Sequence, residues 1–241
     1  WAGSTNDYDL FILDSTGNTV LGGSTTVQSG AQEPFEGLAP GADVDERIVI
    51  VKVSGEDRFL HVDSGRGGMS VNTAGFFAGH SSATNAFSTA SVNVATAFPN
   101  PFAGGAQNPV EDSSSDGPRR VFFNPDGTPI TPGNFLATGG FVRQYPTIAA
   151  SDGVSTPVPG FSPFFGTSAA APHAAGIAAL IKSFNPTLTL AQIRVLLTST
   201  ALDNEATGLV FNGGYGIVMA NAAVAGAPPR QVPIIDLKTN I

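Results

Sequence analysis

The hydrophobic positions of the first 60 residues follow the short period of β-strands. Residues 8–14, YDLFILD, form an apolar run with a polar start, and DSTGN at 14–18 has the composition of a turn. A second strand, TVLGGS, follows at 19–24. The stretch ERIVIVKVSG at 46–55 is apolar on nearly both faces, which predicts a buried strand. We therefore expect a small β-sandwich over residues 1–60.

The middle of the chain contains one further strand and many turns. FSTASVNVA at 87–95 has the pattern of a strand, whereas residues 99–147 are dense in Pro, Gly, Asn and Asp. Within that region NPDGTP at 124–129 places Pro and Gly where a type I turn prefers them, with apolar residues on both sides. The pattern predicts a hairpin there.

The C-terminal part is helical. Residues 168–184 form one predicted helix, which ends at Asn185-Pro186. Thr189 and Gln192 have the spacing of a capping box, which predicts a second helix through Thr200. Strands first and helices later indicate an α/β or α+β main domain. We expect one stripe of the second helix to be buried, made of Leu190, Ile193, Leu196 and Leu197.

Composition and charge exclude several classes of partner. The chain has 241 residues, a charged share of 12% and a net charge of −8, with no run of basic residues. These values argue against partners such as nucleic acids and anionic membrane surfaces. No apolar run reaches the ~18 residues of a membrane span. Without cysteine there is no disulfide and no thiol nucleophile. An acidic, Lys-poor composition is typical of a secreted bacterial protein.

Ser168 is the candidate for chemistry, because it begins a helix made almost entirely of Ala, Gly and Ile. A helix that is apolar all round is expected to be buried, which would hold its N-terminus in place. Unpaired N–H groups at that end suit a developing oxyanion, and Gly166 allows close approach of a substrate. The alternative is that Ser168 belongs to an ordinary cap on a core helix.

Several motifs resemble those of the subtilisin-like serine proteases, the subtilases. GTSAAAPHAAGIAAL at 166–180 is similar to their nucleophile motif, G-T-S-x-A-x-P-H-[VA]-[AS]-G. PTIAASDGV at 146–154 resembles P-D-I-x-A-P-G-V, although Thr147 replaces Asp and Ser151-Asp152 replaces Pro. Weaker likenesses are found in GHSSATNAFSTASVNVA at 79–95, SSDGP at 114–118 and GYGIVMANAAV at 214–224.

The resemblance implies a fold and an activity for most of the chain. Residues 75–225 would form the C-terminal half of a subtilase catalytic domain, which is an α/β fold with a parallel sheet. Ser168 would be the nucleophile of a serine endopeptidase, and a polypeptide would be the substrate. The family's His in the P-H pair is structural, and His173 occupies that position here.

A serine nucleophile needs a His and an Asp, and their location is the open question. His173 lies five residues after Ser168, a rotation of roughly 140°, so it cannot reach the hydroxyl. Asp63 and His80 have the family order, but they lie only 17 residues apart and the H-G-T-H context is absent. We therefore expect Asp63 to be a turn residue and His80 a loop residue. We expect His61 to be a strand residue.

The preferred interpretation places the acid, the base and the oxyanion-hole Asn upstream of Trp1, in a missing N-terminal catalytic half. Residues 1–20 resemble the start of a β-sandwich that some large subtilases insert within the catalytic domain. The expected domains are this partial module at 1–60, a catalytic half at 61–228 and a tail at 229–241, with a flexible joint at 63–68.

Three functional hypotheses follow. The first is a secreted, extracellular endopeptidase that is inactive as this chain alone; the second is an inactive subtilase-fold binding or adhesion module. The third is activity through Asp63, His80 and Ser168. No cofactor is required, although Ca²⁺ is possible near Asp7, Asp9 and Asp14, which are otherwise turn carboxylates. Arg119-Arg120 is too short for a binding patch. A substrate cleft or simple aromatic packing would explain Phe161, Phe164 and Phe165.

Overall fold

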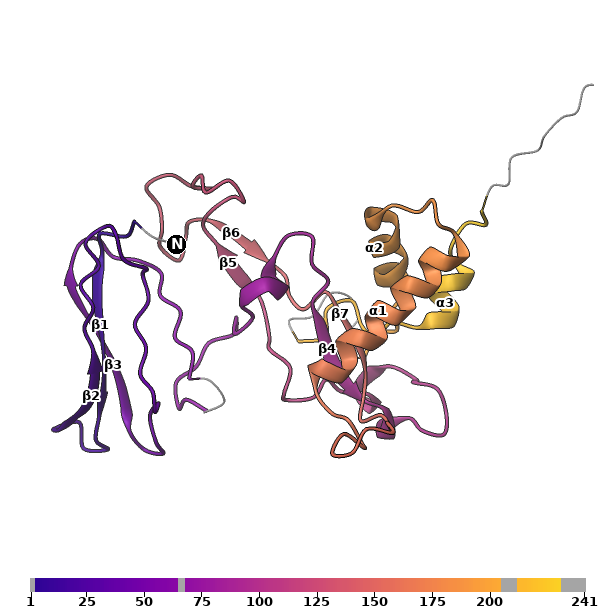
Figure 1. Ribbon diagram of the computed structural model, residues 1–241, viewed down its shortest axis with the longest axis horizontal. Helices are drawn as coiled ribbons and strands as arrows, with labels where there is room; N and C mark the ends of the chain where they lie inside the picture. Colours follow the sequence, from indigo (N-terminus) through magenta and orange to yellow (C-terminus); the bar gives the residue numbers. More distant parts are fainter. Residues whose placement is uncertain (1–2, 65–67, 205–211, 231–241) are drawn as a thin grey trace, which may run out of the picture. The chain divides into compact units, whose positions relative to one another are not determined.

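The chain divides into two units, and each contains two separate stretches of sequence. The computed structural model describes residues 3–64, 68–204 and 212–230 (Figure 1). The first unit joins Trp1–Asn72 to Val121–Phe141, and the second joins Thr73–Arg120 to Val142–Ile241.

The domain boundaries expected from the sequence stay a prediction. The two units differ from them chiefly because Val121–Phe141 groups with the N-terminal residues. The centre of the expected joint, 65–67, lies outside the described residues, as do the first two residues and most of the tail after residue 230.

The first unit is built on one antiparallel sheet. Its strands are β1 (Asp7–Leu13), β2 (Val20–Ser24) and β3 (Arg47–Ser54), and β1 lies in the centre. The predicted turn between the first two strands is confirmed, because the Gly17 N–H donates to the Asp14 carbonyl at 2.9 Å. All three strands lie within one or two residues of the predicted bounds.

The prediction that β3 is buried is wrong. Ile50, Val51 and Val53 are 37%, 42% and 54% exposed. A strand is buried on both faces only when other layers cover both, and the described part of this unit has a single three-stranded sheet. The β-sandwich therefore stays a prediction.

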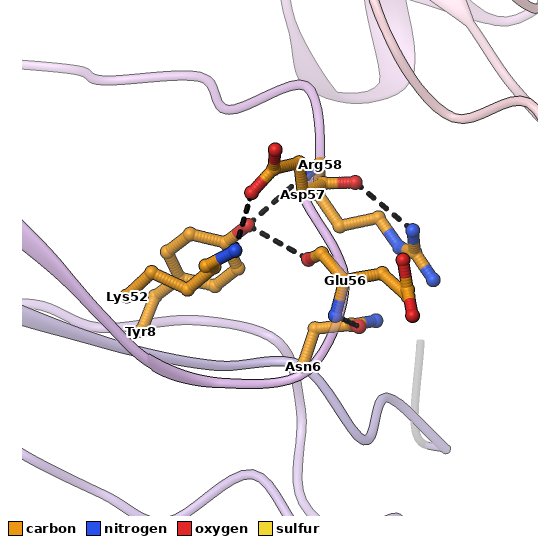
Figure 2. A network of polar contacts seen from close by, with 6 residues as sticks. All are labelled: Asn6, Tyr8, Lys52, Glu56, Asp57 and Arg58. Carbon is orange, nitrogen blue, oxygen red and sulfur yellow. Dashed lines mark hydrogen bonds and ion pairs between the residues drawn. The ribbon is translucent and has the colours of Figure 1, made fainter.

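Polar contacts connect the central strand to the segment that follows β3 (Figure 2). The Tyr8 hydroxyl donates to the Glu56 carbonyl at 3.0 Å and accepts from the Arg58 N–H at 3.0 Å. The Asn6 side-chain oxygen accepts from the Glu56 N–H at 2.8 Å. These bonds fix where the chain leaves the sheet. An exposed ion pair, Lys52–Asp57, lies beside them.

The predicted hairpin at 124–129 is confirmed. Phe123 and Pro129 form an antiparallel bridge, and the Gly127 N–H donates to the Asn124 carbonyl at 2.9 Å. The residues around the hairpin pack within the first unit, where the Phe59 ring lies 5.7 Å from that of Phe122.

The second unit contains a parallel strand pair, β4 (Thr89–Asn93) and β7 (Ile148–Asp152). Their register pairs Thr89 with Ile148 and Asn93 with Asp152, so both strands end at the same edge. Ile217 continues the parallel arrangement by bridging to Ala149. Two short paired strands, β5 (Arg119–Val121) and β6 (Phe141–Arg143), lie where the chain passes between the units.

Within the described part of the chain, three helices accompany these strands: α1 (Thr167–Phe184), α2 (Leu190–Ser199) and α3 (Ala220–Ala225). Both predicted helices are confirmed within a residue, and so is the capping box of Thr189 and Gln192. None of the described helices has the length and hydrophobicity that crossing a bilayer requires. Short 3-10 turns occupy Gly79–Ser82, Val94–Thr96 and Gly105–Gln107.

The main core lies between β7 and the helices (Figure 1). Ile148 and Ala150 of β7 pack with Ala170, Ala174 and Ile181 of α1, whereas the alternate residue of β7 belongs to a second cluster on the other face. The predicted α/β class is confirmed. In the apolar stripe of α2, Ile193 and Leu197 are buried as predicted, but the prediction for Leu190 is wrong, because it is 54% exposed.

Two glycines of the first helix should respond oppositely to alanine. Gly166 caps α1 with φ 89° and ψ 175°, a conformation that only glycine adopts readily, so Gly166→Ala should cost about 1–3 kcal/mol. Gly176 lies inside the helix with open space where an alanine Cβ would lie, so Gly176→Ala should add about 0.5–1 kcal/mol. Urea denaturation measures both changes. Equal effects at the two positions would contradict the assignment of strain to Gly166.

Candidate active site

Ser168 lies in the first turn of α1, at the edge where the parallel strands end. The helix begins at Thr167, one residue earlier than predicted, and Ser168 is exposed. Among the residues that the structure describes, none accepts from or donates to its hydroxyl. The carboxyl edge of a parallel sheet is where α/β proteins commonly bind ligands. The serine hydroxyl is therefore exposed at an edge of the sheet where a ligand could bind.

Backbone N–H groups are available beside this serine. The Ala169 and Ala170 N–H groups donate to the Gly166 carbonyl at 2.9 and 3.2 Å. The N–H groups of Thr167 and Ser168 precede the first intrahelical bond, so the helix itself gives them no acceptor. Together with the positive end of the helix dipole, they form a region that favours an oxyanion.

The turn before Ser168 is attached to the end of β7. Asp152 is the last residue of that strand and is fully buried. Its Oδ2 accepts a hydrogen bond from the Gly166 N–H at 2.5 Å. Gly166 is the residue immediately before α1. The loop between Asp152 and Gly166 closes on itself through an antiparallel bridge of Val154 with Phe164. The strand end therefore fixes where the helix starts.

The prediction that α1 is buried on every side is wrong. Ala169, Ala170, Ala174 and Ile181 are buried, but the opposite face is open, and Leu180 is 55% exposed. The buried residues recur at helical spacing, and Ala170, Ala174 and Ile181 pack in the core cluster that includes β7 and α2, so only that stripe is covered. A shallow apolar groove follows the open face, lined by Pro172, His173, Gly176, Ile177 and Leu180.

None of the three histidines is placed beside Ser168 by a described contact. The His173 Nδ1 lies 2.8 Å from the Ala169 carbonyl of its own helix, which fixes the ring away from the serine. His80 lies in the second unit, in the 3-10 turn Gly79–Ser82. His61 lies in the first unit outside the described strands, so its prediction as a strand residue is wrong. Asp63 is also in the first unit, whereas Ser168 is in the second. The alternative arrangement Asp63–His80–Ser168, which the sequence disfavours, is therefore not tested.

The aromatic residues before Ser168 pack partly on one another. The Phe161 and Phe164 rings meet edge to face, with centroids 5.2 Å apart. Phe161 and Phe165 are each 50% exposed, so they also offer apolar surface near the serine. Both interpretations of these residues, packing and cleft lining, therefore have support.

Glu111 is a residue of this region that the sequence alone did not indicate. Its carboxyl is a neighbour of that of Asp152, and it accepts the Asn93 Nδ2–H at 3.1 Å. The interaction with Asp152 and burial raise the pKa of Glu111 to about 7. The only trace in the sequence is the departure from the family pattern at Ser151-Asp152, where an acid stands in place of Pro.

Stability should therefore fall as pH rises from the acid range towards about 7. Because the folded pKa of Glu111 lies above its unfolded value, its contribution is complete below about pH 4.3 and is lost as pH approaches about 7. Solvent screening at this partly exposed group limits the effect to about 2–4 °C in Tm between about pH 5 and 8. Thermal unfolding monitored by circular dichroism measures it. Glu111→Gln should remove the difference, and a variant that keeps it would contradict the assignment.

Carboxylates near β1 accept hydrogen bonds from other groups of the chain. Desolvation alone would raise the pKa of Asp14, but hydrogen bonds from Thr16, Asn18 and Thr19 outweigh it and lower the pKa to about 2. The described residues contain no group of three or more His, Cys, Asp or Glu arranged to hold a metal ion. The alternative of calcium binding at Asp7, Asp9 and Asp14 is not tested.

Comparisons with known proteins agree with the motifs. Residues 16–216 match the model described as the subtilase family. Fervidolysin from Fervidobacterium pennivorans is 42% identical over 82 residues, which cover 31% of this chain and 12% of that protein. Alkaline elastase YaB from Bacillus sp. (strain YaB) is 44% identical over 78 residues, which cover 32% of this chain and 20% of that protein. The chain thus matches a minor part of each relative's length.

A solved structure gives a weaker likeness. The crystal structure of fervidolysin, described as a keratinolytic enzyme related to subtilisin, covers 60% of this chain and 20% of its own. The identity is 21% and the TM-score 0.31, a value too low to bear on the fold.

Proposed function

The chain belongs to the subtilase family, and from this membership we propose that it carries the nucleophile, Ser168, of a serine endopeptidase. The observation that supports the proposal is the position of Ser168, exposed in the first turn of a helix at the end of parallel strands. A polypeptide is the substrate class that the family implies. No cofactor is required for this chemistry.

The reaction uses the serine hydroxyl and the backbone around it. The Ser168 oxygen attacks the carbonyl carbon of a peptide bond, and its proton passes to a histidine base. The Ser168 N–H faces the oxyanion that forms, and collapse of the intermediate releases the amine with the histidine's proton. Water then hydrolyses the acyl-enzyme and restores the hydroxyl.

The histidine and the aspartate come, in this proposal, from a catalytic half encoded upstream of Trp1. Two features support it: no described contact brings a histidine of this chain to Ser168, and α1 has an uncovered apolar face. Contiguous exposed apolar surface is typical of an interface. A secreted, extracellular location is part of the same proposal, as is optional binding of Ca²⁺.

Labelling with a fluorophosphonate probe tests the proposal. We expect the 241-residue chain alone to remain unlabelled, and the chain produced with the residues encoded upstream to be labelled at Ser168, as located by peptide mapping. Ser183, exposed near the other end of α1, should stay unlabelled and serves as the internal control.

The other outcomes contradict the proposal in distinct ways. Labelling of the 241-residue chain alone, lost in His80→Ala, would establish activity through Asp63 and His80. No labelling even with the upstream residues would favour the inactive binding or adhesion module.

A further inference from the structure

Asp152 has an unusual environment for a carboxylate that the proposed reaction does not use. Its side chain is fully buried at the end of β7, opposite Asn93 in the parallel register. Oδ2 accepts the Gly166 N–H, but Oδ1 is buried and accepts no hydrogen bond from a fixed donor among the described residues. A buried carboxylate oxygen without a donor is costly, so this oxygen needs a proton nearby.

Glu111 is the group that can supply that proton. Its carboxyl contacts that of Asp152, and its own backbone holds it there, because the Glu111 N–H donates to the Ser91 carbonyl of β4 at 2.9 Å. The Asn93 Nδ2–H occupies Glu111 Oε1 at 3.1 Å. Two carboxyl groups in contact cannot both be ionised at low cost, so they share one proton.

No positive charge among the neighbouring elements replaces that proton. The other charge that acts on Glu111 is that of Asp112, which is also negative. In the sequence, β4, β7 and residues 164–171, which include the start of α1, contain no Lys, Arg or His. These elements therefore supply no positive side chain that could neutralise the carboxyl pair in place of the proton.

We propose that Asp152 is a positioning residue for the Ser168 turn, and that it holds Gly166 through a proton shared with Glu111. The proposal rests on the proposed function for the meaning of Ser168 as a nucleophile, but not for the carboxyl pair itself. With the proton in place, Glu111 donates to Asp152 Oδ1 and Asp152 Oδ2 accepts from Gly166.

Loss of the proton to solvent weakens this support. Two adjacent carboxylates then repel one another, and Asp152 has to move or take up water. Because its Oδ2 is the acceptor for the residue that caps α1, the cap moves with it. The Thr167 and Ser168 N–H groups follow directly, so the orientation of the oxyanion region depends on the protonation of Glu111.

Nuclear magnetic resonance of the Gly166 amide tests the pair without any need for catalysis. In the protein labelled with ¹⁵N, its proton shift should change with a midpoint near pH 7. Glu111→Gln, whose amide can still donate to Asp152, should abolish that change. Asp112→Asn is the matched control and should keep it. A Gly166 shift that is constant from about pH 5 to 9, or that titrates equally in Glu111→Gln, would overturn the proposal.

The pH profile of Ser168 labelling tests the positioning role. In the protein that includes the upstream residues, wild type and Glu111→Gln should label equally at about pH 6, and the variant roughly three- to tenfold faster at about pH 9. Equal rates at both pH values would overturn the positioning role. If no protein labels at any pH, the proposed function fails, and the Gly166 titration still decides whether the shared proton exists.

Discussion

Replacing Ser168 with alanine is expected to lower the rate of peptide hydrolysis by about 10⁴-fold or more, because the acylation step loses its nucleophile. The reference is the protein that includes the proposed upstream half, assayed with casein and with a short chromogenic peptide. The fold should be unaffected, since the Ser168 side chain is exposed and bonds to no described residue. The loss should appear in kcat, because the serine acts on the carbonyl only as the reaction proceeds.

Ser183→Ala is the matched control for this experiment. It removes a second exposed hydroxyl from the same helix and should leave hydrolysis unchanged. Residual activity in Ser168→Ala close to that of wild type would show that another group attacks the substrate, and the proposed function would then be wrong.

Truncating Ile181 to alanine is expected to give the largest loss of stability, about 2–5 kcal/mol. Ile181 is fully buried where α1 meets the core of the second unit, beside Leu188, Ile193 and Leu197. Removing three carbons there takes apolar surface out of the core and leaves a cavity that the helices cannot fill completely. Urea denaturation monitored by circular dichroism measures the change in free energy of unfolding.

The neighbouring residue provides the comparison. Leu180 is 55% exposed, so in the 241-residue chain alone Leu180→Ala should cost less than about 1 kcal/mol. Similar losses at the two positions would mean that the open face of α1 is covered in solution, for example by a second copy of the chain. Sedimentation of the wild-type protein would then show self-association.

The elements of the fold could be predicted where local chemistry decides them. The capping box of Thr189 and Gln192 lies directly at the start of α2, and Asn185-Pro186 follows directly after the end of α1. The turn at Asn124–Gly127 likewise depends on its own four residues. In each case the backbone groups that must be satisfied lie next to the side chains that satisfy them.

Burial could not be predicted in the same way. The residues of β3 and α1 are apolar on most sides, yet Val53 and Leu180 are exposed. An apolar face indicates that a surface tends to be covered, but whether a layer covers it depends on the rest of the assembly. The same reasoning applies to Leu190 in α2, which belongs to the apolar stripe and still faces outward.

The candidate site was predicted in part. Ser168 stands out because its motif is contiguous in the sequence. Glu111 and Asp152 lie far apart in the sequence. The loop after β4 carries Glu111, and the pairing of β4 with β7 brings it to the end of β7, where Asp152 lies. An acid in the middle of a turn-rich region looks like any solvated carboxylate until the strands are placed.

The interleaved course of the chain has a consequence for its synthesis. A nascent chain that has emerged as far as residue 72 contains all three strands of the first sheet, but Phe59 still lacks Phe122 and the Phe135 carbonyl that accepts its N–H at 2.8 Å. Those partners leave the ribosome only after Thr73–Arg120, which belongs to the other unit. The two stretches of the first unit are therefore synthesised at different times, separated by a stretch of the second unit. Neither unit can finish folding before part of the other has been made.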